Sequence, residues 1–177
     1  MDDTAKKNLI LETGRVTGLI VHYIFEKINF AAAQNVNSFA EFLNDDEVFN
    51  TIISAQKKFG VRDSSEIKLN NITYSRITIE LSKMIFNVLT ADILNDGFRL
   101  SNLSVSDKLT EINFYFPAAH IELFNDNGYT PLNYNGYFNG FIDLIFRHNQ
   151  KYYIVDWKTN FIQNGYEQHF LEEVMNL

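Results

Sequence analysis

The sequence predicts an α/β fold, in which a small mixed sheet is flanked by helices and a helical subdomain is added to this core. Apolar residues recur at helical spacing through the first two-thirds of the chain, and the last third holds short aromatic runs that alternate as strands do. The 177 residues, 46% of them hydrophobic, are about the size of one domain and enough to build a substantial core.

Helices are expected in the first two-thirds of the chain. Residues 12–30 place apolar side chains along one wide face. Residues 38–41 have the S-x-x-E form of a capping box, and the helical stripe behind them runs to Gly60, a residue that commonly ends helices. A further helical stretch is expected to break near residues 70–71 and to end at residues 96–97.

Strands are expected in the last third. Residues 111–116 alternate and end at a proline, so they predict a strand, and residues 125–136 read as a polar loop. Residues 137–146 and 151–157 predict a hairpin. A last helix is expected from residue 164, with its apolar side formed by Tyr166, Phe170, Leu171, Val174 and Leu177.

Composition limits the compartment and the kinds of site. The chain has no cysteine, so disulfides and thiolate metal sites are excluded, and any metal must bind oxygen and nitrogen ligands. It has no apolar run of the roughly 20 residues that a membrane span needs, and the acidic start at residues 1–4 is unlike a secretion signal. These features predict a cytoplasmic protein without a membrane partner. The net charge of −7 argues mildly against a free-standing nucleic-acid binder, although a carboxylate-rich metal site contributes negative charge itself.

Two carboxylates interrupt the apolar strands of the predicted hairpin. An isolated buried carboxylate is costly unless it is paired or binds a cation. If residues 149–150 form a two-residue turn, Asp143 lies directly opposite Asp156, with Cβ atoms about 4.5–5.5 Å apart, and Lys158 lies one diagonal step away on the same face. Carboxylates this close repel each other unless a proton or a metal lies between them. A three-residue loop would instead place the two acids on opposite faces.

Each candidate residue also has an ordinary structural explanation. An Asp in a strand often caps a turn or forms a simple ion pair. His22 alone fits the edge of a helix core, and Glu111 fits a solvated strand end or a lysine partner. Tyr152, Tyr153 and Trp157 are expected in the core rather than on a base-stacking surface.

Four ordered segments resemble the nuclease domain of the RecB family, the beta subunit of exodeoxyribonuclease V, within the PD-(D/E)xK superfamily. Residues 140–148 (GFIDLIFRH) and 151–160 (KYYIVDWKTN) resemble its GFIDL…YY-DYKSN block. Residues 18–22 (GLIVH) fit its GxxxH motif, and residues 111–117 (EINFYFP) resemble its E-x-E-F-Y-x-P strand. The segments span residues 18 to 160, and the ordered set is far more specific than a lone DxK.

The resemblance implies a restriction-endonuclease-like core and a metal-dependent deoxyribonuclease site. By match to the family motifs, the metal ligands would be His22, Asp143, Asp156 and the backbone carbonyl of Trp157. Lys158 would be the catalytic lysine, which acts with Asp143 and Asp156 on the attacking water. The expected ion is Mg²⁺, and a histidine ligand leaves Mn²⁺ or Ca²⁺ binding open.

The resemblance also implies a larger assembly. Residues 1–177 would be a single nuclease domain of a helicase-nuclease subunit, with residues 31–97 as a helical insertion. A helicase would feed it single-stranded DNA, and its partners would be the other subunits of a RecBCD- or AddAB-like complex. The family continues into a Q-x-x-x-Y helix that is absent before Leu177, so the chain is expected to be a C-terminally truncated fragment with weak activity or none.

Two other classes of function stay open at this stage. The chain could be a PD-(D/E)xK exonuclease of another system, or a non-catalytic module that keeps the fold for binding. The presence of His22, Asp143, Asp156 and Lys158 counts against the second, because degenerate copies tend to lose metal ligands first.

Overall fold

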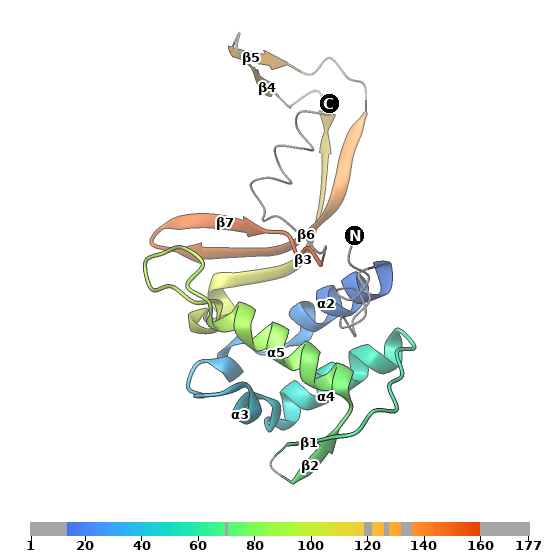
Figure 1. The fold of residues 1–177 in the computed structure, drawn as a ribbon. Helices are drawn as coiled ribbons and strands as arrows, with labels where there is room; N and C mark the ends of the chain where they lie inside the picture. The colour runs from blue at the N-terminus through green and yellow to red at the C-terminus, as the bar shows by residue number, and fades with distance from the viewer. Residues whose placement is uncertain (1–13, 70, 119–121, 126–127, 132–135, 160–177) are drawn as a thin grey trace, which may run out of the picture.

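The computed structural model describes residues 14–69, 71–118, 122–125, 128–131 and 136–159. Helices occupy the first part and most strands the second, so the predicted α/β class is confirmed. Figure 1 shows the helices gathered on one side of the three-stranded sheet. The last helix expected from the sequence lies outside the described residues.

Three of the described α-helices begin at a polar residue whose side chain caps the first turn. The side chains of Ser38, Asp45 and Ser75 each accept a hydrogen bond from a backbone N–H in the first turn of the helix that follows. The stripe predicted to run to residue 60 is therefore two helices, since Asp45 starts a new one. The α-helices of the described part are α2 (Arg15–Lys27), α3 (Phe39–Leu43), α4 (Asp46–Lys58) and α5 (Arg76–Thr90); the 3-10 helices are η1 (Phe30–Ala33), η2 (Leu100–Asn102) and η3 (Val105–Asp107).

A small hairpin replaces part of the predicted third helical stretch. Strands β1 (Ile67–Leu69) and β2 (Ile72–Tyr74) pair antiparallel, so the helical prediction is wrong for these residues. Asn71 in the turn has φ 66°, a left-handed conformation that asparagine tolerates. Helix α5 ends at Thr90, short of the predicted end, because the carboxylate of Asp92 accepts backbone N–H groups of the loop that follows.

The main sheet has the strand order β3-β6-β7, with β3 at Lys108–Pro117, β6 at Tyr137–His148 and β7 at Lys151–Val155. All its pairings in the described part are antiparallel, so no mixed pairing is seen there. Strands β4 (Glu122–Asn125) and β5 (Gly128–Pro131) form a separate pair within the span where a loop was predicted.

The β6–β7 hairpin has the two-residue turn that the sequence predicts. Asn149 and Gln150 have φ of 48° and 63°, as a type I′ turn requires at both central positions. The register then runs back to Leu144 opposite Val155, where the pairing of β7 stops. The even loop length is confirmed, and it places Asp143 one step beyond the last pair.

One face of the main sheet packs against the helices, and the two together form the hydrophobic core. Leu144 and Phe146 of β6 are 0% and 1% exposed and belong to the same cluster as the buried residues of α2, α4 and α5. Tyr153 and Trp157 pack against this cluster as predicted, whereas Tyr152 is 74% exposed, so its expected core position is wrong. The main buried side chains of the helices are Ile20, Ile24, Phe25, Val48, Ile52, Leu81, Ile85 and Leu89.

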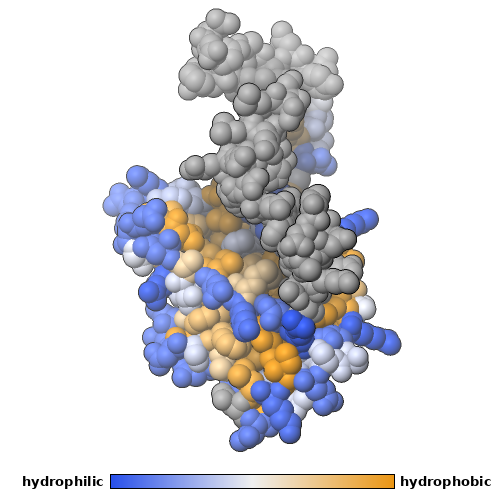
Figure 2. Space-filling model, viewed as in Figure 1, coloured by the Kyte–Doolittle hydropathy of each residue, from blue (hydrophilic) through white to orange (hydrophobic). Residues whose placement is uncertain are grey.

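The surface of the helical part mixes hydrophobic and hydrophilic residues on the side seen in Figure 2. Among the helices that the structure describes, none combines the length and the hydrophobicity that crossing a membrane requires.

Candidate metal centre

Helix α2 positions His22 beside the middle of β6, near the point where the pairing of β7 stops. The buried residues Ile20, Ile24 and Phe25 fix this helix against the core, and His22 projects from its more open side. Nδ1 of His22 lies 3.1 Å from Oδ1 of Asp143, and its Nε2 lies 3.0 Å from the carbonyl oxygen of Trp157. Residues from α2, from β6 and from the segment that follows β7 therefore meet at one imidazole ring.

The two oxygens around this ring are both acceptors. A neutral imidazole donates a hydrogen bond from one ring nitrogen and carries a lone pair on the other. Of the two nitrogen–oxygen contacts of His22, one would therefore be a hydrogen bond and the other would have no hydrogen between its two atoms. The arrangement is satisfied either by a doubly protonated His22 or by a cation that binds the lone pair and the oxygens. The contacts of His22 thus fit a cation at this place.

Asp143 is the buried carboxylate of the site, with 8% of its surface exposed. Its Oδ1 faces His22, and its Oδ2 accepts a hydrogen bond of 2.6 Å from the backbone N–H of Trp157. Trp157 is held in turn by its side chain, which stacks on Phe25 with ring centroids 4.1 Å apart. Core packing therefore fixes the backbone groups that contact both His22 and Asp143.

Glu111 faces the same place from strand β3. Thr110 pairs with Leu144 and Ile112 with Ile142, but Glu111, between them, makes no ladder pair and has φ 52°. The continuous register places it opposite Asp143. A left-handed conformation is costly for a residue with a side chain and commonly marks a functional site.

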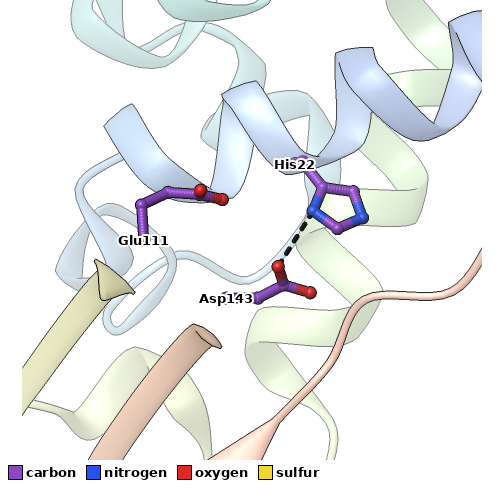
Figure 3. A group of neighbouring side chains, drawn as sticks. All are labelled: His22, Glu111 and Asp143. Atoms are coloured by element: carbon purple, nitrogen blue, oxygen red, sulfur yellow. Dashed lines mark ion pairs between the residues drawn. The ribbon is translucent and has the colours of Figure 1, made fainter. Parts of the chain in front are cut away.

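The structure brings His22, Glu111 and Asp143 into one group. Each offers a ligand atom, and these atoms lie within 4.8 Å of one another. Figure 3 shows the three side chains converging from α2, β3 and β6. Carboxylate oxygens and one imidazole nitrogen form a donor set that suits Mg²⁺ or Mn²⁺, and the nearby carbonyl of Trp157 would add a further oxygen.

The electrostatics of Glu111 agree with this geometry. Burial raises the pKa of the Glu111 carboxyl above its ordinary value, and the carboxylates of Asp143 and Glu26 raise it further, while His22 opposes the shift. A cation bound between these carboxylates would offset their repulsion.

Asp156 and Lys158 lie apart from this group. They form an ion pair of 2.8 Å with each other, and their side chains are 60% and 55% exposed. The pairing of β7 ends at Val155, so the strand geometry that would hold Asp156 against Asp143 is not continued. The prediction that Asp143 and Asp156 face each other on adjacent paired strands therefore stays a prediction. Glu111 lies opposite Asp143 on the other neighbouring strand, β3.

The sequence alone left the role of Glu111 open, with a solvated strand end or a lysine partner as its ordinary explanation. The structure half-buries its side chain beside two other candidate ligands instead. The signal that would have found it is the β3–β6 register. That register could not be counted from the sequence, because the connection from Pro117 to Tyr137 is too long to define a turn.

Curated relatives of this chain carry a single name, RecBCD enzyme subunit RecB. The protein from Borreliella burgdorferi is 32% identical over 173 residues, which cover 94% of this chain and 14% of that protein. The protein from Escherichia coli is 33% identical over 113 residues, covering 54% of this chain and 10% of that protein. The protein from Haemophilus influenzae is 25% identical over 194 residues, covering 99% of this chain and 14% of that protein.

The chain is a RecB-related domain. The similarity to the Borreliella burgdorferi protein covers nearly the whole chain and therefore includes the three segments that meet at His22. No family model matches the chain. The RecB-related domain spans only about 10–14% of the length of these relatives.

Proposed function

We propose that this RecB-related domain is a metal-dependent deoxyribonuclease that hydrolyses DNA phosphodiesters. The observation that carries the proposal is the convergence of His22, Glu111 and Asp143, from α2, β3 and β6. The backbone of Trp157 contacts two of the three, and the DxK segment follows β7 directly. Two members of this donor set, His22 and Asp143, are also residues that the motif resemblance implies as ligands, which supports the proposal.

The proposed ligands are His22, Asp143, Asp156 and the carbonyl of Trp157, and Glu111 is added to them on the geometry described above. Mg²⁺ is the proposed ion, with Mn²⁺ or Ca²⁺ as substitutes in binding. When bound, the ion would lower the pKa of a coordinated water and neutralise phosphate charge. Asp156 enters this set through its place in the motif.

Lys158 is proposed as the catalytic cation. Its ammonium group lies 2.8 Å from Asp156, which keeps a positive charge beside a proposed ligand. There Lys158 would orient the attacking water and stabilise the extra negative charge that phosphorus gains in the transition state. The exposure of this pair leaves it accessible to a DNA strand arriving from solvent.

The activity of a whole helicase-nuclease is a proposal as well. The relatives are named as subunits of a RecBCD enzyme, so we propose that this domain works within a larger subunit and complex, in repair and recombination of broken DNA in the cytoplasm. A helicase partner that delivers single strands would reduce the need for basic surface, in keeping with the net charge of −7.

A nuclease assay on end-labelled single-stranded DNA tests the proposal. The full-length subunit in its complex should cut DNA with Mg²⁺ and lose cutting with a chelator. Asp143→Asn and Lys158→Ala should each reduce the rate at least about 100-fold. Glu80→Gln, on the exposed side of α5, is the matched charge-removing control and should leave the rate unchanged.

The outcome separates catalysis from binding. If the folded complex binds DNA with Mg²⁺ present but cuts at the same negligible rate in wild type and in both variants, the nuclease proposal fails. The non-catalytic binding module then replaces it.

A further inference from the structure

Strands β3 and β6 continue as a two-stranded ribbon beyond the part of the sheet that includes β7. The pairing of β7 with β6 stops at Leu144, whereas β3 and β6 stay paired as far as Pro117 and Tyr137. Figure 1 shows the two strands running on together, away from the helices. The ribbon, defined as residues 112–117 and 137–142, contains no charged residue. Any ligand that it binds is therefore held by ring faces, amides and apolar contacts.

One face of the ribbon carries exposed aromatic rings. Tyr115 and Tyr137 stack on each other with centroids 4.7 Å apart, yet they are 64% and 62% exposed, so the outer side of each ring is accessible. Phe141, also 64% exposed, lies on the same side of β6 as Tyr137, because side chains four positions apart in a strand share a face.

Exposed asparagines alternate with these rings. Asn139 pairs with Tyr115, and Asn113 pairs with Phe141, so each amide lies beside a ring on the same face of the ribbon. We call this face of rings and amides the aromatic face. It has no leucine, isoleucine or valine, the side chains that a protein partner would most readily pack against.

Rings that alternate with amides match the chemistry of unpaired nucleobases. Bases that are not held in a duplex stack on aromatic side chains, and amides form hydrogen bonds with base edges. A duplex keeps its bases stacked on one another, so the aromatic face would select single strands. Stacking needs no positive charge on the protein, in keeping with the net charge of −7.

We propose that the aromatic face binds single-stranded DNA by stacking bases on Tyr115, Tyr137 and Phe141. This inference rests on the proposed nuclease function, because it names how the substrate strand of that site is bound. The face leads to the metal centre, since Asp143 is two positions beyond Phe141 on β6 and Glu111 is four positions before Tyr115 on β3. The six residue steps from Tyr137 to Asp143 span about 20 Å, so several nucleotides would be held beside the metal centre.

Binding of labelled oligonucleotides to the whole chain, measured by fluorescence anisotropy in chelator, tests the proposal. The probes are an oligothymidine of about 20 nucleotides, an abasic strand of the same length, which keeps the phosphates and lacks the bases, and a duplex. Wild type should bind the oligothymidine at least about ten times more tightly than either of the other two probes.

The variants remove one ring at a time. Tyr115→Ala and Tyr137→Ala should each raise the Kd for oligothymidine about 5- to 150-fold and leave the Kd for the abasic strand unchanged. Tyr115→Phe should retain most of the affinity, because a ring still stacks. Tyr152→Ala removes an exposed tyrosine outside the ribbon and is the matched control, with the Kd of wild type. Circular dichroism checks that each variant is folded.

Two outcomes would overturn the proposal. Equal affinity of wild type for the oligothymidine and the abasic strand would show that no base is stacked, and would favour a protein as the partner of the aromatic face. Unchanged oligothymidine binding in both alanine variants would show that the bases stack elsewhere. Binding in chelator does not require catalysis, so base-dependent binding without nuclease activity supports the aromatic face while the nuclease proposal fails.

Discussion

Nε2 of His22 lies 3.0 Å from the carbonyl oxygen of Trp157, 135 positions further along the chain. The contact joins the first described helix to the residue between Asp156 and Lys158. Because the Trp157 ring is stacked on Phe25 of the same helix, core packing fixes a backbone oxygen beside the imidazole. The candidate metal centre is therefore built on the hydrophobic core.

Divalent metal should stabilise the fold. Ligands that bind only the folded state add about 2.7 kcal/mol at a concentration 100 times Kd, so millimolar Mn²⁺ should raise the melting temperature. Asp143→Asn should remove the increase. Asp96→Asn is the matched control. It disrupts a different His–Asp ion pair, between His148 and Asp96 (3.1 Å), which lies outside the site, and the variant should retain the increase in melting temperature. An equal increase in wild type and Asp143→Asn would place the metal elsewhere.

Glu111 should be destabilising without metal. Glu111→Gln removes repulsion by Asp143, and Glu111→Gly also removes the cost of φ 52°, about 1 kcal/mol. In chelator, the urea concentration at the midpoint of unfolding should be higher for Glu111→Gln than for wild type, and higher still for Glu111→Gly. Asn71→Gly, at φ 66° in the β1–β2 turn, controls for relief of backbone strain alone.

With saturating Mn²⁺, both Glu111 variants should show a smaller gain in stability from metal than wild type. If both Glu111 variants were less stable than wild type in chelator, repulsion between Glu111 and Asp143 would not destabilise the folded state.

The stacking of Trp157 on Phe25 should contribute to both stability and the site. Trp157→Ala should cost about 3 kcal/mol of unfolding free energy, while Trp157→Phe should retain most of it, because an aromatic ring still stacks. Unfolding is followed by circular dichroism, since Trp157 is the one tryptophan in the chain. If the alanine variant kept wild-type affinity for Mn²⁺, packing would not position the Trp157 carbonyl.

Asp63 should make stability depend on pH in the acid range. Its carboxylate accepts hydrogen bonds from the hydroxyl and backbone N–H of Ser65 and from the backbone N–H of Ile77, and these hold its pKa below the ordinary value. A lowered pKa in the folded state means that this stabilisation is present above the unfolded pKa of about 3.9 and is lost as pH falls through the folded value. The difference in urea midpoint between wild type and Asp63→Ala should therefore be largest at pH 6 and shrink below pH 4. A difference that stays constant from pH 6 to pH 3 would contradict this, and Glu66→Ala provides an exposed control.

The sequence by itself determined the local features. Asn149 and Gln150 set the hairpin turn, and the two-residue loop then fixed the register back to Leu144 opposite Val155. The cap at Ser38 was also predicted, and its side chain accepts the N–H of Glu41. These features depend on neighbouring residues alone, so turn chemistry and hydrogen bonding within a few positions are enough to specify them.

Only the tertiary structure decided which acids meet. Glu111 lies opposite Asp143 because β3 pairs with β6 across a long connection, and no count along the chain gives that register. Asp156 forms an ion pair with Lys158 just beyond Val155, the last paired residue of β7. The alternation of residues along a strand predicts on which face each side chain lies. Contacts between distant segments depend on how the whole core packs, and this packing brings His22 into contact with Asp143.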